Sequence, residues 1–132
     1  MTFLLDTHVL LWALLKHENL TKKVQTALTD RSNRIFVSNI SLWEISLKYA
    51  SKKLMLENLT PDDFPDQILE SGFEFLEDRS EVFSSFYKLP FHKHFDPFDR
   101  LLVWQAISYN LKLITKDKHF QSYSKSGLEI FW

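Results

Sequence analysis

Acidic side chains recur where short apolar strands are expected to end and where helices are expected to begin. The positions are Asp6, Glu44, Asp96, Asp99 and Asp117. In a parallel α/β sheet such points lie at one edge, the carboxyl edge, where ligands bind. Carboxylates that cluster in an apolar cleft repel one another and therefore need a cation. We predict that this edge of the sheet holds a metal ion.

The donor set favours Mg²⁺ or Mn²⁺ over zinc, because the chain has no cysteine and the candidate ligands are carboxylate oxygens. Mg²⁺ usually keeps several waters and takes a few carboxylates together with phosphate oxygens of a substrate. A bound ion of this kind lowers the pKa of a water and neutralises the charge that develops in the transition state. The pattern therefore predicts hydrolysis of a phosphodiester bond.

Helix capping explains each acid when that acid is taken alone. Asp96, Pro97 and Asp99 all suit the first turn of a helix. Ser41 and Glu44 have the S-x-x-E spacing of a capping box. Capping by itself does not require several strands at one edge to deliver an acid to the same place. The set as a whole therefore favours a site, while the capping interpretation stays open for each member.

The stretch at residues 94–106 is the one around which the chain is organised. Between residues 101 and 107 only Gln105 is polar, so this helix is apolar nearly all round. Such a helix is buried on more than one side. Residues 98–110 carry more apolar surface than one sheet face covers. We therefore predict a symmetric homodimer that uses this side of the molecule.

Strands and helices alternate along the chain. Strands are predicted at residues 2–5, 35–38, 73–76, 111–115 and 128–132. Helices are predicted at residues 9–15, with Thr7 as their cap, and at 20–28, 41–50, 61–70, 80–89 and 96–110. This alternation is typical of a parallel sheet with helices on both faces. We predict one domain over residues 1–132, a three-layer α/β/α fold around a parallel sheet of four to five strands.

Composition excludes several kinds of site. The 16 basic and 17 acidic side chains balance, so a generally basic nucleic-acid coat is excluded, although a local basic rim is not. With only Gly72 and Gly127 as glycines, the chain has no Gly-rich phosphate loop. No signal-peptide pattern is present, and the apolar run at residues 9–15 is too short to span a bilayer. We expect a cytoplasmic protein that makes no membrane contact.

Four short motifs follow one another along nearly the whole chain. They are L-L-D-T-H at residues 4–8, S-N-I-S-L-W-E-I at 38–45, H-F-D-P-F-D-R-L-L at 94–102 and L-I-T-K-D at 113–117. This series resembles the PIN domain family, and specifically the VapC-type toxins of bacterial toxin–antitoxin pairs. The D-P-F-D-R segment is the most specific part of the match. The chain departs from many relatives at Trp104, near a position where they carry Ala.

The resemblance implies an endoribonuclease that depends on Mg²⁺ or Mn²⁺, partnered by a small antitoxin protein and forming a homodimer. The implied metal-binding and catalytic residues are Asp6, Glu44, Asp99 and Asp117. Asp96 is placed at the rim of the site, and Thr115, in the last motif, is assigned an auxiliary role with it.

Basic residues flank the acids closely and either hold an RNA backbone or balance local negative charge. They are Lys93, Arg100, Lys116 and Lys118. Lys48 stands four residues after Glu44, and we predict an ion pair between the two on one helix face. The histidines near the acids are predicted to face solvent rather than to bind zinc. These are His8, His92, His94 and His119.

Two other functions compete with the ribonuclease. One is a phosphatase with Asp6 as its nucleophile. It is disfavoured because that class is marked by a D-x-D motif, whereas position 8 of this chain is His. The other is a non-catalytic α/β binding module, against which the intact set of acids argues.

Overall fold

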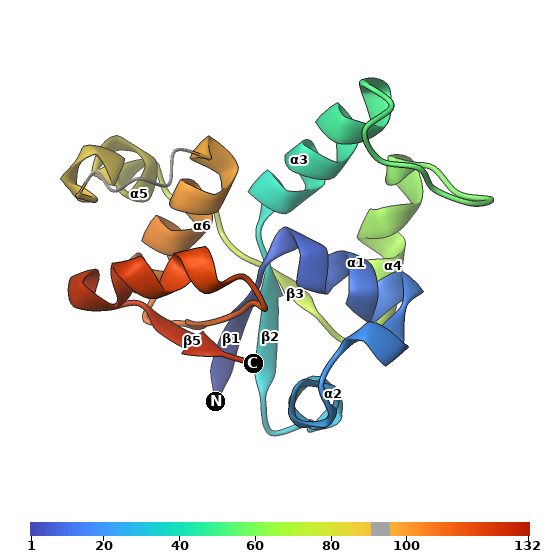
Figure 1. Cartoon of the computed structure of the whole chain (residues 1–132), viewed down its shortest axis with the longest axis horizontal. Coiled ribbons are helices and arrows are strands. Elements are labelled where there is room, and N and C mark those ends of the chain that lie inside the picture. The colour runs from blue at the N-terminus through green and yellow to red at the C-terminus, as the bar shows by residue number, and fades with distance from the viewer. Residues whose placement is uncertain (91–95) are drawn as a thin grey trace.

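The computed structural model describes residues 1–90 and 96–132, and a sheet of five parallel strands forms its centre (Figure 1). The strands are β1 (Thr2–Leu5), β2 (Arg34–Val37), β3 (Glu74–Phe75), β4 (Lys112–Ile114) and β5 (Glu129–Phe131). Their order across the sheet is β3-β2-β1-β4-β5. The chain order reverses between β1 and β4, which is the switch point where ligands bind in open parallel sheets. All five predicted strands are present.

Helices connect the strands. The α-helices are α1 (Thr7–Leu15), α2 (Lys22–Thr29), α3 (Asn39–Ala50), α4 (Phe64–Glu70), α5 (Ser80–Ser84) and α6 (Pro97–Ser108). Short 3₁₀ turns are η1 (His17–Asn19), η2 (Pro61–Asp63), η3 (Phe86–Lys88) and η4 (Lys118–Ser126). The helix predicted at 80–89 divides into α5 and η3. Over residues 1–90 and 96–132, every helix falls short of the length and apolar character that a membrane crossing requires.

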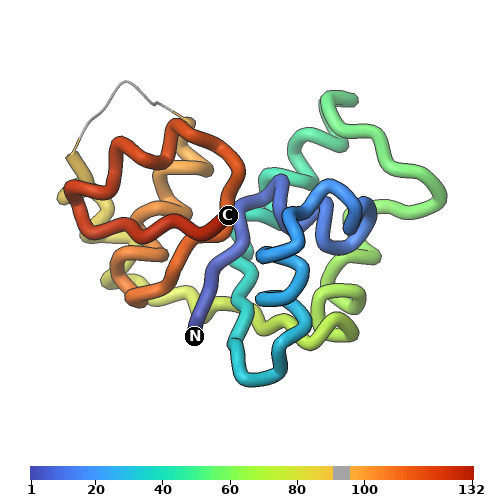
Figure 2. The backbone as a smooth tube through the Cα atoms, turned by 60° about the horizontal axis from the view of Figure 1, so that its bottom comes forward, coloured from blue at the N-terminus to red at the C-terminus, as the bar shows by residue number. Residues whose placement is uncertain are grey.

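Two separate cores lie on the two faces of the sheet. Along β1, Phe3 and Leu5 pack into one core with α1, α2 and α4, while Leu4 packs into the other with α6 and η4. This alternation follows from the two-residue period of a strand. In Figure 2 the two helical layers lie on either side of β1. The predicted three-layer α/β/α architecture is therefore confirmed. Because both faces of the sheet are covered, the central strand β1 carries three buried apolar residues in succession, Phe3, Leu4 and Leu5.

The start of α3 differs from the prediction. Ser38 is the N-cap, and its Oγ accepts a hydrogen bond from the backbone N–H of Ile40 at 3.1 Å. Ser41 and Glu44 lie inside the helix and are buried, so the predicted capping box is wrong. Thr7 was likewise predicted to cap α1 but is its first residue, and its Oγ1 donates to Ser41 Oγ at 2.9 Å. Each helix begins earlier than predicted because the strand before it ends in a residue that turns directly into the helix.

The start of α6 is as predicted. The Oδ1 of Asp96 accepts hydrogen bonds from the backbone N–H groups of Phe98, at 2.9 Å, and Asp99, at 3.1 Å. Pro97 occupies the first turn, where its missing N–H has no cost. The helix then buries side chains on more than one side, as its nearly uninterrupted apolar run predicted. Those buried are Arg100, Leu102, Val103, Gln105 and Ala106.

Candidate active site

Asp6 lies where β1 ends, beside the end of the neighbouring strand β4. Its side chain is only 4% exposed. Thr115 Oγ1 donates a hydrogen bond to Asp6 Oδ2 at 2.7 Å and accepts one from the backbone N–H of Asp117 at 3.0 Å. One threonine thus orients a buried carboxylate and fixes the turn that carries the next acid. Burial raises the pKa of Asp6, and the charge of Glu44 adds to this, although the Thr115 hydrogen bond opposes it.

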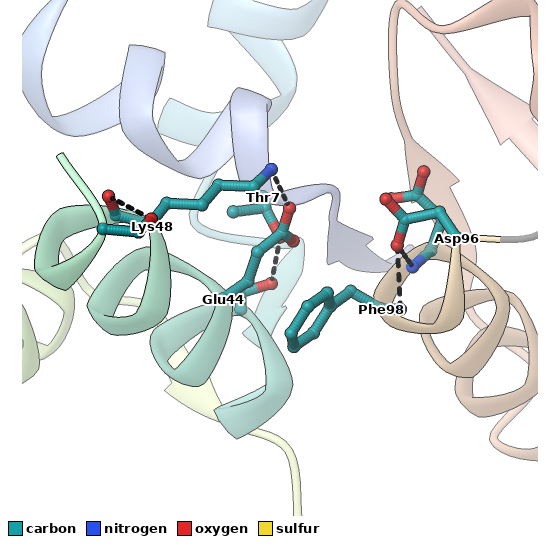
Figure 3. A network of polar contacts seen from close by, with 8 residues as sticks. Thr7, Glu44, Lys48, Asp96 and Phe98 are labelled. Carbon is teal, nitrogen blue, oxygen red and sulfur yellow. Dashed lines mark hydrogen bonds and ion pairs between the residues drawn. The ribbon is translucent and has the colours of Figure 1, made fainter. Parts of the chain in front are cut away.

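Glu44 projects from the second turn of α3 and is 2% exposed. Its Oε2 is bound by Lys48 Nζ at 2.5 Å, which confirms the predicted ion pair. Its Oε1 is buried and has no hydrogen-bond partner among the described residues. A buried carboxylate oxygen without a partner costs stability unless a donor or cation reaches it. In Figure 3, Glu44 and Lys48 on α3 lie across from Asp96 at the start of α6.

The charges of the other four acids all act on Asp99. Burial, followed by the charges of Asp96, Asp6, Glu44 and Asp117, raises the pKa of Asp99 to about 8. This shift means that carboxylates from the ends of two strands and from two helices act on one another. As predicted from their positions along the chain, the carboxyl edge of the sheet therefore gathers the negative charge. The chemistry of the donors fits a divalent cation, because the side chains that gather here offer carboxylate oxygens and Glu44 Oε1 is buried without a hydrogen-bond partner among the described residues.

Asp96 and Asp117 also perform the capping that each position suggests alone. Asp117 Oδ1 accepts from the backbone N–H of His119 at 2.9 Å and contacts its Nδ1 at 2.8 Å. The side chain of Asp6, by contrast, makes no capping bond at the start of α1. Within residues 1–90 and 96–132, no three acidic or histidine side chains are close enough to hold one ion as they stand. The buried acids are thus the inner part of the cluster, and the capping acids its rim.

The basic residues divide into two groups. Lys116 and Lys118 are exposed beside the acids, as RNA-contacting residues require. Arg100 is 4% exposed, and its guanidinium donates to the carbonyl oxygens of Leu89 and Pro90, both at 3.2 Å. The predicted RNA contact of Arg100 is therefore corrected: α6 turns this side chain inward, where it ties the preceding segment to the helix.

The remaining sequence predictions concern histidines and Lys93. His8 and His119 are exposed, in agreement with the prediction that these side chains face solvent. His92, His94 and Lys93 lie outside the described residues, so their predicted roles stay predictions.

Two buried polar pairs near the acids were missed by the sequence analysis. One is the Thr7–Ser41 hydrogen bond, which joins α1 to α3 between Asp6 and Glu44. The other joins the N-cap of α3 to α6, where Ser38 Oγ donates to Gln105 Oε1 at 2.7 Å. The single polar residue of an apolar helix was the available signal for the second pair. No local signal marked the first.

The fold and the site define a class: a three-layer α/β/α domain whose central parallel sheet carries an acidic cluster at its carboxyl edge. The chain belongs to the PIN domain family, whose sequence model matches residues 3–126. The resemblance derived from the four motifs is thereby confirmed. No curated protein sequence matches the chain.

Solved structures agree with this assignment at the level of the fold. VapBC2 from Rickettsia felis, bound to a DNA fragment from their promoter, is 19% identical with a TM-score of 0.66; 99% of this chain and 98% of that chain are covered. DNA-bound VapBC from Salmonella typhimurium is 18% identical with a TM-score of 0.63, and the match covers 99% of this chain and 97% of that chain. VapBC-1 from nontypeable Haemophilus influenzae is 17% identical with a TM-score of 0.61, and the match covers 99% of this chain and 97% of that chain.

Proposed function

We propose that this protein is an endoribonuclease that depends on Mg²⁺ or Mn²⁺ and acts as the toxin of a toxin–antitoxin pair. The observation that carries the proposal is the buried Glu44 carboxylate, whose Oε1 lacks a partner in a cluster that raises the pKa of Asp99 to about 8. A cluster of this kind needs a cation, and its donors are all oxygens. Membership of the PIN domain family and the match of the motifs to VapC-type toxins support it.

Asp6, Glu44 and Asp99 would hold the ion, and Asp117 would complete the site from its rim. Because no three of these groups converge as they stand, the ion would take few carboxylates directly and keep waters, as Mg²⁺ does. When bound, such an ion supplies an activated water and neutralises charge at the phosphoryl group.

The protein's own residues prepare this site. Thr115 holds the Asp6 carboxylate in one orientation through its 2.7 Å hydrogen bond. Lys48 binds Oε2 of Glu44, while Oε1 stays buried without a hydrogen-bond partner among the described residues. Asp96 fixes the first turn of α6 and thus the position of Asp99. Lys116 and Lys118 are exposed at the rim, where they would bind the phosphates of an RNA backbone.

The biological role extends the proposal to a partner. The similar folds are those of VapBC and FitAB proteins, and the motifs resemble VapC-type toxins. We therefore infer that a small antitoxin protein binds this chain and restrains its activity. Co-purification with the product of an adjacent small reading frame, and relief of growth arrest by it, test this part.

The enzymatic proposal is tested by incubating total RNA with the purified protein, with Mg²⁺ or Mn²⁺ and then with EDTA. We expect cleavage that EDTA abolishes. Asp6→Asn and Asp99→Asn should each lower the cleavage rate by orders of magnitude while the far-UV spectrum stays native, because the charge that holds the ion is lost.

The matched control is Asp66→Asn. Asp66 stands in the first turn of α4, as Asp99 does in α6, but is exposed and outside the acidic cluster. This variant should cleave RNA at the wild-type rate. Cleavage at that rate by Asp6→Asn and Asp99→Asn would contradict the assignment. Release of phosphate from a small ester without RNA cleavage would favour the phosphatase, and metal binding without turnover would favour the binding module.

A further inference from the structure

A second feature borders the acidic cluster on the side of α1 and β4. It is a pocket of about 190 Å³ lined by Asp6, His8, Trp12, Lys116 and Asp117. Its volume lies below the roughly 300 Å³ at which pockets for drug-sized ligands begin. The pocket therefore has room for one ring system and not for a whole nucleotide.

Trp12 is the aromatic centre of this pocket. The ring centroid of His8 lies 6.2 Å from that of Trp12 with an interplanar angle of 51°. Trp132 lies 6.1 Å away at 54°. Lys116 Nζ stands 5.9 Å from the centroid of the Trp12 ring. A half-buried indole is thus held by aromatic neighbours and has the ammonium group of an exposed lysine over it.

We propose that this pocket binds an unpaired nucleobase of the RNA substrate, stacked against Trp12, an inference that rests on the proposed function. We name Trp12 the stacking residue and Lys116 the residue that contacts the adjoining phosphate. The base takes the place over the indole that Lys116 occupies in this structure, and the flexible lysine moves to the negatively charged backbone.

The chemistry of the walls selects this ligand over others. Asp6 and Asp117 repel a simple anion. The proposed metal ion would bind to these acids on the side of the cluster, because the apolar indole on the other side of the pocket offers it no ligand. A nucleobase presents a π face to Trp12, and its own phosphate reaches Lys116 beside it. Stacking on an aromatic side chain requires an unstacked base, which single strands provide and duplexes do not. The predicted substrate is therefore single-stranded RNA, with little base preference because every base has a π face.

The position of the pocket links recognition to cleavage. Asp6 and Asp117 line both this pocket and the acidic cluster, so a base held against Trp12 sets its own phosphate next to the proposed metal site. The pocket would fix which phosphodiester bond is presented, independently of the identity of the base.

The test measures binding without cleavage, in the Asp99→Asn background and in EDTA. The probes are a short labelled oligoadenylate and an abasic oligoribonucleotide of equal length and charge. Fluorescence anisotropy should show the oligoadenylate bound roughly tenfold more tightly, in line with the stacking energy of one base. Trp12→Leu, which keeps apolar packing in the core, should remove this difference. Trp12→Phe should restore most of it.

Two controls separate stacking from folding. Trp104→Leu makes the same substitution on α6, in the other core, and should leave the tenfold preference intact. If Trp12→Leu does not fold, indole fluorescence decides: oligoadenylate should quench it, the abasic strand should not, and the quenching should be absent from Trp12→Phe.

A full preference for the oligoadenylate in folded Trp12→Leu overturns the inference, as does quenching that persists in Trp12→Phe. The two proposals fail separately. RNA cleavage by the wild-type protein without any base-dependent binding overturns the pocket and leaves the nuclease standing. Base-dependent binding that follows Trp12, without cleavage, supports the pocket and overturns the nuclease.

Discussion

Replacement of Asp99 by Asn should stabilise the protein when no metal is bound. The substitution keeps the size of the side chain and removes one negative charge from a cluster that already contains Asp6, Glu44 and Asp117. Those charges, together with burial, raise the pKa of Asp99 from 3.8 to about 8. The folded state therefore carries a penalty for every ionised Asp99 side chain, and an amide carries none.

The size of the effect follows from the pKa shift. One pKa unit corresponds to about 1.4 kcal/mol, so a full shift to about 8 sets an upper limit of about 4 kcal/mol on the penalty at pH 7. Water reaches the partly exposed side chain of Asp99 and screens these charges. We therefore expect Asp99→Asn to raise the free energy of unfolding by about 1 kcal/mol in EDTA at neutral pH.

The dependence on pH has a definite sign. The unfolded chain releases the Asp99 proton near pH 4 and the folded chain near pH 8, so the folded state binds the proton more tightly. The stability of the wild-type protein then falls as pH rises between these values. The advantage of Asp99→Asn should be absent at pH 4, grow through neutral pH and level off above pH 8.

Thermal melting in EDTA across this pH range, followed by melting in excess Mg²⁺ or Mn²⁺, checks the reasoning. Metal should stabilise the wild-type protein more than the variant, because it binds only the folded form and needs the carboxylate. Asp66→Asn is the control: it measures how much the melting temperature changes when a helix loses a first-turn acid that lies outside the acidic cluster. If Asp99→Asn melts below the wild-type protein at pH 8 in EDTA and gains as much from metal, Asp99 is a helix-terminal charge and not a ligand.

Three further predictions concern other parts of the molecule. Lys48→Met leaves the buried Glu44 carboxylate without its counter-charge, so the metal-free protein should lose about 1 kcal/mol of stability after solvent screening, and thermal melts in excess Mg²⁺ should recover it. Arg100→Met leaves the buried carbonyl group of Leu89 and the half-buried carbonyl group of Pro90 without their donor, and it should lower the free energy of unfolding in urea by about 3 kcal/mol, while the salt dependence of RNA binding stays unchanged. Trp43 is 61% exposed, and its ring centroid lies 5.2 Å from that of Phe98 in an edge-on contact. The two rings line an apolar groove between α3 and α6, which we assign to the homodimer interface. Light scattering at tens of micromolar should therefore find a dimer for the wild-type chain and a monomer for Trp43→Glu; a wild-type monomer would contradict the assignment.

Much of the fold and the polar contacts close along the chain were determined by the sequence itself. The five strands were predictable because a parallel sheet covered on both faces places apolar side chains on both sides of its strands. Each strand therefore lies in a short, mostly hydrophobic segment, although a charged residue such as Glu74 interrupts some of them. The cap of α6 was predictable because Asp96 and Pro97 act on their own helix turn. The Lys48–Glu44 pair was predictable because residues four apart share a helix face.

Competition between neighbouring signals limited the sequence analysis at α3. Ser38 and Ser41 both suit an N-cap, and only the end of β2 at Val37 decides that Ser38 takes that role. Ser41 is then carried into the helix interior, where it faces Thr7. A local rule cannot rank two equally suitable caps, because the choice depends on how far the preceding strand pairs with its neighbours.

Contacts between distant segments were decided only by the tertiary structure. Arg100 looked like an RNA-binding side chain because it stands beside acids, yet its partners Leu89 and Tyr123 lie 11 and 23 residues away. Thr115 reaches Asp6 across 109 residues only because β1 and β4 pair in the sheet. Periodicity and capping act over a few residues of chain, whereas burial and charge coupling depend on which segments the sheet order places side by side.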